Sequence, residues 1–231
     1  MVVTRISEKI NLKKYLLIIL CSWGLVAQAQ NNPYVDDKLV HFGFSLGVNL
    51  MSFHIPNDDP ARVSNLLPGF NVGFVSDVRL SRHLNLRFCP GLSFSQRTIQ
   101  YKETYYSLIG DQVVLLSIPI SIPLYLKWSA ERENNYRPYL IGGGGMEYNV
   151  YRDAEQPVLL KGLDYFVEVG FGCDFYFQWF KCCPQITYRI GFANVLTPVE
   201  ENIYITEEQA PYTNVLTKLT SQALYITFNF E

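Results

Sequence analysis

Apolar and polar residues alternate with a period of two along most of this chain. In the segment 39–55, Phe42, Phe44, Leu46, Val48 and Leu50 fall on one face of an extended chain, and His41, Gly43, Ser45, Gly47 and Asn49 fall on the other. The same alternation recurs in segments 70–80, 84–97, 113–128, 165–178, 185–192 and 224–230, whereas segment 137–150, which contains four consecutive glycines, shows no clean face. Because successive side chains of a strand point to opposite sides, the pattern predicts eight strands, each with an apolar and a polar face.

The residues on the polar face decide between two all-β architectures. A soluble sandwich or barrel would bury the apolar face and expose Lys, Glu and Thr to water, whereas a membrane barrel turns its apolar face to lipid. Here the polar face is crowded with Gly, Ser and Asn and carries a few charges of both signs, which suits the narrow interior of a small barrel. We therefore expect an eight-stranded antiparallel up-and-down transmembrane β-barrel.

Loop lengths and aromatic residues predict how this barrel sits in its membrane. The connections after the second, fourth and sixth segments are short and the others are longer, as in outer-membrane barrels with both termini in the periplasm. Trp128 and Trp179 are expected at the periplasmic rim, and Tyr101, Tyr148 and Tyr165 at the opposite rim, as two interfacial girdles.

Composition supports this interpretation and excludes several other classes. Charged residues make up 17% of the 231 residues, whereas soluble chains average about 25%. The aromatic content of 15% and the net charge of −2 are unlike a disordered chain. A chain with so little net charge carries no signal for binding a polyanion, so nucleic acid is not expected as a partner.

The N-terminus has the features of a secretory signal peptide. Lys13 and Lys14 precede the apolar run 15–26, and Ala27-Gln28-Ala29 forms a cleavage site of the A-x-A kind. Cys21 is a less favoured lipoprotein acceptor because the preceding residue is a bulky Leu. We expect residues 1–29 to be removed, which leaves a single barrel domain, residues 30–231, with a net charge of −5 in the outer membrane of a Gram-negative bacterium.

Inward-facing charges are the most interesting candidate constellation. Alternation directs seven of them into the lumen: Asp77, Arg79, Arg87, Arg97, Glu168, Asp174 and Arg189, with Lys127 and Glu147 close to them. A buried ion network that fills and stiffens the barrel is favoured over a conducting or recognition role, since eight strands enclose too little space for a wide channel.

Little in the sequence indicates catalysis, and no cofactor or metal site is expected. The three histidines do not converge, and a lipid hydrolase built from His54, Ser64 and Asp58 or Asp59 has no motif spacing behind it. The four cysteines outside the signal peptide lack a C-x-x-C motif, which argues against zinc. A disulfide from Cys173 to Cys182 or Cys183 is conceivable, and free thiols are at least as well supported.

The fourth segment contains an unusual pair of prolines, Pro119 and Pro123. Proline donates no N–H, and residues four apart in a strand direct their N–H groups toward the same neighbour, so both gaps fall in one seam. The simplest interpretation is a bend. The sharper hypothesis is a weakened wall that contacts another membrane protein.

Four stretches resemble the PorT family of Bacteroidota outer-membrane proteins: 40–49, 122–128, 134–143 and 172–177, of which the run Asn-Asn-Tyr-Arg-Pro-Tyr in 134–139 is the most specific. The resemblance implies a non-catalytic accessory protein of the type IX secretion system, needed to export cargo with a conserved C-terminal signal domain. Its partners would be outer-membrane lipid and other secretion-system membrane proteins, with no small-molecule substrate. The alternatives are a generic structural or adhesive small barrel and, less favoured, a lipid-modifying barrel enzyme.

Overall fold

A computed structural model describes residues 38–56, 59, 61–64, 67–101, 112–151, 158–199 and 210–231. The signal-peptide prediction for residues 1–29 lies outside these ranges, as does Asp58. The described elements are β1 (Val40–His54), β2 (Ala61–Ser64), β3 (Pro68–Arg79), β4 (Leu84–Phe88), β5 (Gly91–Tyr101), β6 (Gln112–Ser117), β7 (Pro119–Ser129), β8 (Tyr136–Asn149), β9 (Leu163–Tyr176), β10 (Lys181–Gly191), α3 (Ala210–Asn214) and β11 (Thr220–Phe230). Within these ranges no helix is both long and apolar enough to cross a membrane.

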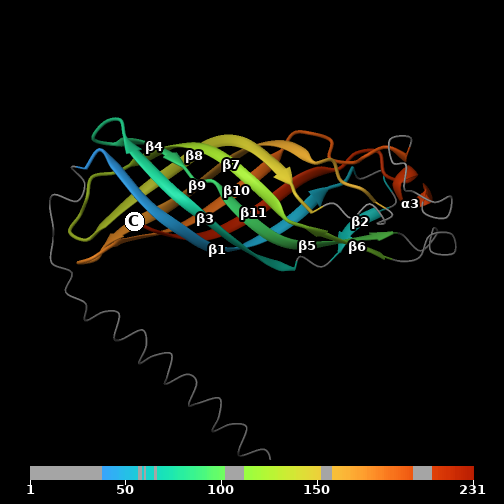
Figure 1. The fold of residues 1–231 in the computed structure, drawn as a ribbon, viewed down its shortest axis with the longest axis horizontal. Coiled ribbons are helices and arrows are strands. Elements are labelled where there is room, and N and C mark those ends of the chain that lie inside the picture. Colours follow the sequence, from blue (N-terminus) through green and yellow to red (C-terminus); the bar gives the residue numbers. More distant parts are fainter. Residues whose placement is uncertain are drawn as a thin grey trace, which may run out of the picture.

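The strands close into one antiparallel barrel (Figure 1). Strand β1 pairs with β11 on one side and with β3 on the other, which removes the free edges of the sheet. The segments β4 and β5 are two halves of one barrel strand, as are β6 and β7, so the wall has eight strands. This confirms the predicted fold class. We call the end with the short connections 80–83, 130–135 and 177–180 the turn end, and the opposite end, which carries β2, β6 and α3, the loop end (Figure 1).

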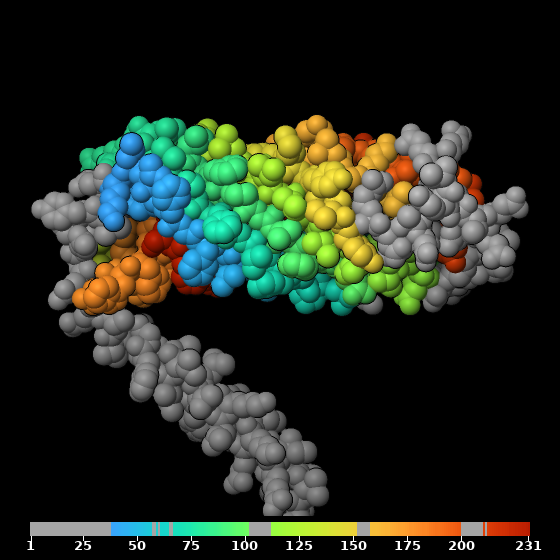
Figure 2. All heavy atoms as spheres, viewed as in Figure 1, coloured from blue at the N-terminus to red at the C-terminus, as the bar shows by residue number. Residues whose placement is uncertain are grey.

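Side chains alternate across the wall as the sequence predicts. In β7 every second residue is buried, from Pro119 through Lys127 to Ser129, and those between them are exposed. The apolar side chains of Phe42 and Phe74 are 75% and 74% exposed, whereas Asn49 and Asp77 on the inner face are fully buried. The inside of the barrel is therefore polar and its outside is apolar, which is the arrangement of a barrel in lipid. On the face shown in Figure 2, side chains fill the wall without an opening.

Glycines on the inner face make room for polar side chains on the neighbouring strand. Ser45 lies opposite Gly73, Asn49 opposite Gly69, and Asn71 opposite Gly47. A Cβ atom on Gly69 would overlap Asn49 Oδ1, and one on Gly73 would lie 2.9 Å from Ser45 Oγ. At these three positions a glycine on the inner face leaves the space that the polar side chain on the neighbouring strand occupies.

Two predicted segments are interrupted at or next to a proline. The third segment breaks at Cys89 and Pro90, between β4 and β5, and the fourth breaks at Ile118, between β6 and β7. Segment 137–150, which showed no clean face, does alternate: Tyr139, Ile141, Glu147 and Asn149 point inward. The four glycines had concealed that pattern because they have no side chain that reports a face.

An apolar cap closes the loop end, which the sequence analysis did not predict. Its core includes Phe53 of β1, Ile99 and Leu115 of the β5–β6 hairpin, and Leu216 and Leu219, which follow α3. Tyr101 belongs to this core and is only 1% exposed, so its predicted place in an interfacial girdle is wrong. Tyr148 and Tyr165 are about half exposed, at 53% and 52%. Beyond Arg97 the inner face of the third segment turns apolar, because there the hairpin packs against the cap.

Candidate functional site: the charged lumen

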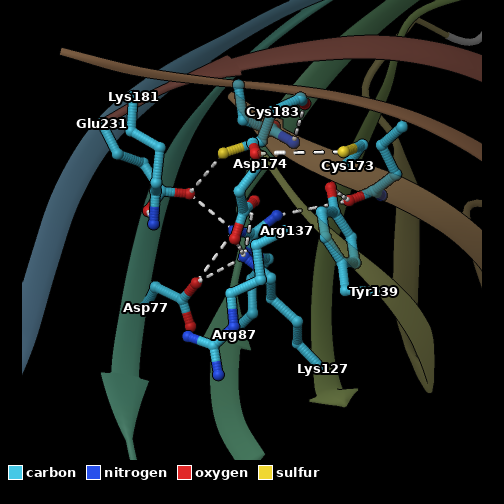
Figure 3. Close-up of polar contacts among 12 residues, drawn as sticks. Asp77, Arg87, Lys127, Arg137, Tyr139, Cys173, Asp174, Lys181, Cys183 and Glu231 are labelled. Carbon is cyan, nitrogen blue, oxygen red and sulfur yellow. Dashed lines mark hydrogen bonds and ion pairs between the residues drawn. The ribbon is translucent and has the colours of Figure 1, made fainter. Parts of the chain in front are cut away.

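Six charged side chains form a buried cluster in the turn-end half of the lumen (Figure 3). This turn-end ion cluster consists of Asp77, Arg87, Lys127, Asp174, Lys181 and Glu231. Arg87 donates from Nη2 to Asp77 Oδ2 at 2.8 Å and to Glu231 Oε1 at 2.6 Å. Lys127 Nζ donates to both oxygens of Asp174, at 2.9 and 2.7 Å, and lies 3.5 Å from Asp77. Lys181 Nζ lies 2.6 Å from Glu231 Oε2.

The cluster is electrically balanced, which makes its burial tolerable. Three carboxylates face three cations, and every one of these side chains is at most 4% exposed. Tyr139 supports the cations, since the Arg87 guanidinium lies 5.4 Å and Lys127 Nζ 4.2 Å from its ring centre. Gln185 links Arg87 to Tyr139, because its Oε1 accepts a hydrogen bond from Arg87 at 3.3 Å and another from the Tyr139 hydroxyl at 3.1 Å. Buried charges are retained at tolerable cost when they are paired and hydrogen-bonded in this way.

A second, smaller cluster lies toward the loop end. Arg189 of β10 donates from Nε to Glu168 at 2.8 Å and from Nη1 to Glu147 at 2.6 Å. Its guanidinium also lies 3.8 Å from the Phe166 ring centre and 4.5 Å from that of Tyr225. Arg189 therefore joins the three neighbouring strands β8, β9 and β10 on the inner face of the wall.

Arg97 lies directly beneath the apolar cap in a different environment. Its Nη2 contacts Met51 Sδ at 3.2 Å and Ser117 Oγ at 3.3 Å, and its guanidinium lies 4.4 Å from the ring centre of Phe53. Among the side chains the structure describes, no carboxylate lies within ion-pair distance of Arg97. Its charge is therefore held by aromatic, sulfur and hydroxyl contacts in place of an ion pair.

A small cavity lies between the two clusters. Its volume is about 50 Å³, and its lining includes Ser93, Ser121, Gln185 and Arg189. A water needs roughly 10–15 Å³ of such space, so the cavity holds a few waters at most. Among the described residues, ion pairs occupy the lumen on the turn side of this cavity and the apolar cap covers its loop end.

The structure brings most of the predicted charges together but divides them between separate groups. Asp77, Arg87 and Asp174 belong to the turn-end ion cluster, Glu168 and Arg189 to the second cluster, and Arg97 stands apart. Arg79 lies half-buried at the turn end of β3. Lys181 and Glu231 were not predicted from the sequence. Lys181 lies two residues before Cys183 and Glu231 two residues after Asn229, so the period-two pattern, if extended, would have placed both on the inner face.

The two prolines of β7 both face the lumen, and their nitrogens lie in the seam with β4 and β5. Ile118 donates to Asn149 Oδ1 at 3.1 Å, toward β8, and Ser129 donates to the His83 carbonyl at 2.8 Å, toward β4. Odd-numbered residues of β7 therefore direct their nitrogens toward β4 and β5. In that seam only the pairs 91–121 and 92–120 connect β5 to β7.

The remaining candidate residues do not assemble into a site. His54 is exposed at the loop end of β1, and buried Asp59 accepts hydrogen bonds from the backbone and hydroxyl of Thr217, at 3.0 and 2.8 Å. His83 lies at the turn end, with Nδ1 3.0 Å from the Ser129 carbonyl. Cys89, Cys173, Cys182 and Cys183 are free thiols, and Cys183 faces Asp174 in the β9–β10 register. No metal-binding group of three or more His, Cys, Asp or Glu residues occurs in the described ranges.

Comparison with known proteins identifies an outer-membrane barrel family. Residues 28–197 match the family model described as outer membrane protein beta-barrel domain. No curated protein matches the sequence.

Three solved structures are similar in fold. One is Neisserial surface protein A, with 8% identity, 83% of this chain and 98% of that chain covered, and a TM-score of 0.46. Another is the N-terminal β-barrel domain of Pseudomonas aeruginosa OprF, with 11% identity, 87% and 99% coverage, and a TM-score of 0.34. The third is the outer membrane protein AlkL, with 13% identity, 87% and 96% coverage, and a TM-score of 0.41.

Proposed function

Because this chain belongs to the outer membrane protein beta-barrel domain family, we propose that it is a non-catalytic outer-membrane protein that acts through contacts of its surface. The observation that carries this proposal is the filled lumen. A barrel whose interior is occupied by two ion clusters and capped by an apolar core has its wall, turns and loops left for function.

The specific role we propose is that of an accessory protein in type IX secretion. Support comes from the sequence stretches that resemble the PorT family, of which Asn134 to Tyr139 is the most specific. These residues form the β7–β8 turn and the start of β8. In this proposal both termini, and therefore the turn end, face the periplasm, where cargo with a C-terminal signal domain arrives.

The partner contact is proposed at the seam between β7 and the β4–β5 strand. Register places Cys89 opposite Pro123 and Ser93 opposite Pro119, so two carbonyls on this seam face residues that cannot donate. A wall with fewer ladder bonds separates more easily and suits contact with another membrane protein. Replacing both prolines with Val should restore the ladder and weaken partner capture; unchanged capture by the folded variant would refute the seam hypothesis.

Deletion of the gene tests the secretion role. In the deletion strain, cargo with the C-terminal signal domain should accumulate in the periplasm, and a plasmid copy of the wild-type gene should restore export. Normal export in the deletion strain, with the barrel absent from its outer membrane by immunoblot, would remove the secretion role and leave the family assignment untouched.

A structural or adhesive role is the alternative that a specific observation favours. The loop end carries a cap with its own apolar core, and in this alternative the cap would present a binding surface beyond the lipid-facing wall. An adhesive barrel would leave export normal in the deletion strain and would reduce surface attachment. The less favoured enzyme reading predicts that His54→Ala abolishes function, whereas we expect this variant to complement fully.

A further inference from the structure

The outer wall has a recess at the turn end, where β7, β8 and β9 lie side by side. Its volume is about 240 Å³, and its lining includes Trp128, Ala130, Pro138, Leu140, Phe171 and Gly172. The recess lies on the apolar outer face, next to the short β7–β8 turn.

The register explains why the wall is hollow here. Trp128, Leu140 and Phe171 form one outward row across the three strands, and each is more than half exposed. The next outward row toward the turn end contains the smaller residues Ala130 and Pro138. They are neighbours, because the Ala130 nitrogen donates to the Pro138 carbonyl at 2.9 Å. In β9 the residue at that level of the outward row is Cys173, which lies opposite Pro138. A row of large side chains therefore stands beside a row of small ones, and the step between them is the recess.

Two arginines lie near the recess without lining it: Arg137 bonds to Ala130, which does line it, and Arg137 also bonds to the backbone of Arg82. The Arg137 guanidinium donates from Nε to the carbonyl of Ala130 at 2.8 Å and from Nη2 to the carbonyl of Arg82 at 2.6 Å. The Arg82 side chain is 75% exposed, and its nearest carboxylate, Glu131, lies 3.2 Å away and is 69% exposed. An exposed pair of this kind is weak, so an anion in the membrane interface competes readily with Glu131 for Arg82.

We propose that the recess binds one acyl chain of an anionic phospholipid whose phosphate lies against Arg82 and Arg137. The apolar floor and the nearby arginines together match a molecule with an apolar chain and an anionic head. The lipid-facing position supplies such molecules at high local concentration. The recess is only one row of residues wide, which is enough for an acyl chain. It is too narrow for a helix, whose diameter with side chains is about 10–12 Å. This inference rests on the family assignment and is independent of the secretion role.

Quenching of Trp128 by brominated lipid tests the proposal, because this residue lines the recess. The chain has three tryptophans, so Trp23→Phe together with Trp179→Phe leaves Trp128 as the only one. The matched control keeps Trp179, which is 87% exposed and outside the recess, by replacing Trp23 and Trp128 with Phe. Both proteins are folded into vesicles that contain dibromo-phosphatidylglycerol or dibromo-phosphatidylcholine, and relative binding constants are taken from the quenching.

We expect phosphatidylglycerol to be preferred about fivefold over phosphatidylcholine at Trp128, the effect of roughly one basic side chain on anionic lipid. No preference is expected at Trp179. Arg82→Gln should abolish the preference at Trp128, whereas Arg62→Gln, at an exposed position of β2 in the loop end, should leave it unchanged. Ala130→Phe should fill the recess and reduce quenching at Trp128 to the level at Trp179. Equal quenching of the two tryptophans in the parent proteins, or a preference that survives Arg82→Gln, would overturn the proposal.

Discussion

Lys127→Met is the substitution that most directly tests whether the turn-end ion cluster holds the barrel together. Methionine has nearly the length of lysine without its charge. The change leaves Asp174, which is 3% exposed and accepts two bonds from Lys127, without its closest cation. It also removes a second cation from Asp77, whose carboxylate lies 3.5 Å from Lys127 Nζ.

The expected cost follows from this burial. Removal of one partner of a buried ion pair destabilises a protein by about 3–5 kcal/mol, mostly because a charge is left buried and uncompensated. In the double variant Lys127→Met with Asp174→Asn that charge is gone, so the double variant should be more stable than Lys127→Met alone. Arg82→Gln removes an exposed ion pair, at 75% and 69% exposure, and should cost less than about 1 kcal/mol.

Urea unfolding of the barrel in phospholipid vesicles measures these differences. Tryptophan fluorescence follows the transition, and the mobility of unheated samples on gels reports the folded fraction. If the free energy of unfolding depends on urea concentration with a similar slope in all variants, their free energies of unfolding can be compared directly. A stabilising role of the cluster is refuted if Lys127→Met costs no more than Arg82→Gln, or if adding Asp174→Asn makes Lys127→Met still less stable.

Three further predictions concern the packed interior. Gly143→Ala should destabilise the barrel by about 1–3 kcal/mol through overpacking, because the new Cβ would overlap the Leu124 carbonyl oxygen. Gly142→Ala should be nearly neutral, because its Cβ has only Val169 within 4 Å. Equal urea midpoints for the two variants would contradict this. Leu219→Ala should cost about 2–4 kcal/mol and expose the loop end to protease, since Leu219 is fully buried in the cap; unchanged proteolysis of the loops would show that the cap does not depend on this core. The wild-type protein should give no stable conductance steps in planar bilayers, because ion pairs fill its lumen, and sustained open steps would refute the closed interior.

Much of the fold could be predicted from alternation alone, because a strand in a small membrane barrel must place apolar residues in lipid and polar residues in the lumen. Phe42 and Phe74 point outward, and Asn49 and Asp77 point inward, as their positions in the pattern require. The pattern failed at the four glycines of β8, which carry no side chain to mark a face. It also failed at Tyr101, because an apolar residue at a rim fits both a lipid girdle and a buried cap.

The candidate site was predictable as a set of inward charges but not as a set of partners. Arg87 and Glu231 are 144 residues apart in the chain, and Lys127 and Asp174 are 47 apart. Each strand fixes only the face on which its own charges lie. Which charges meet depends on the register between strands and on the closure of β1 onto both β3 and β11.

The sequence by itself determined that this chain forms strands with a lipid face and a lumen face, since period-two alternation is a local property of each strand. Tertiary structure alone decided that the lumen charges divide into two clusters around a small cavity, that Lys181 and Glu231 complete the turn-end cluster, and that an apolar cap covers the loop end. It also decided where the recess beside Trp128 lies, because that step exists only when three strands stand in one register. These features depend on contacts between distant segments, and local alternation contains no information about register or closure.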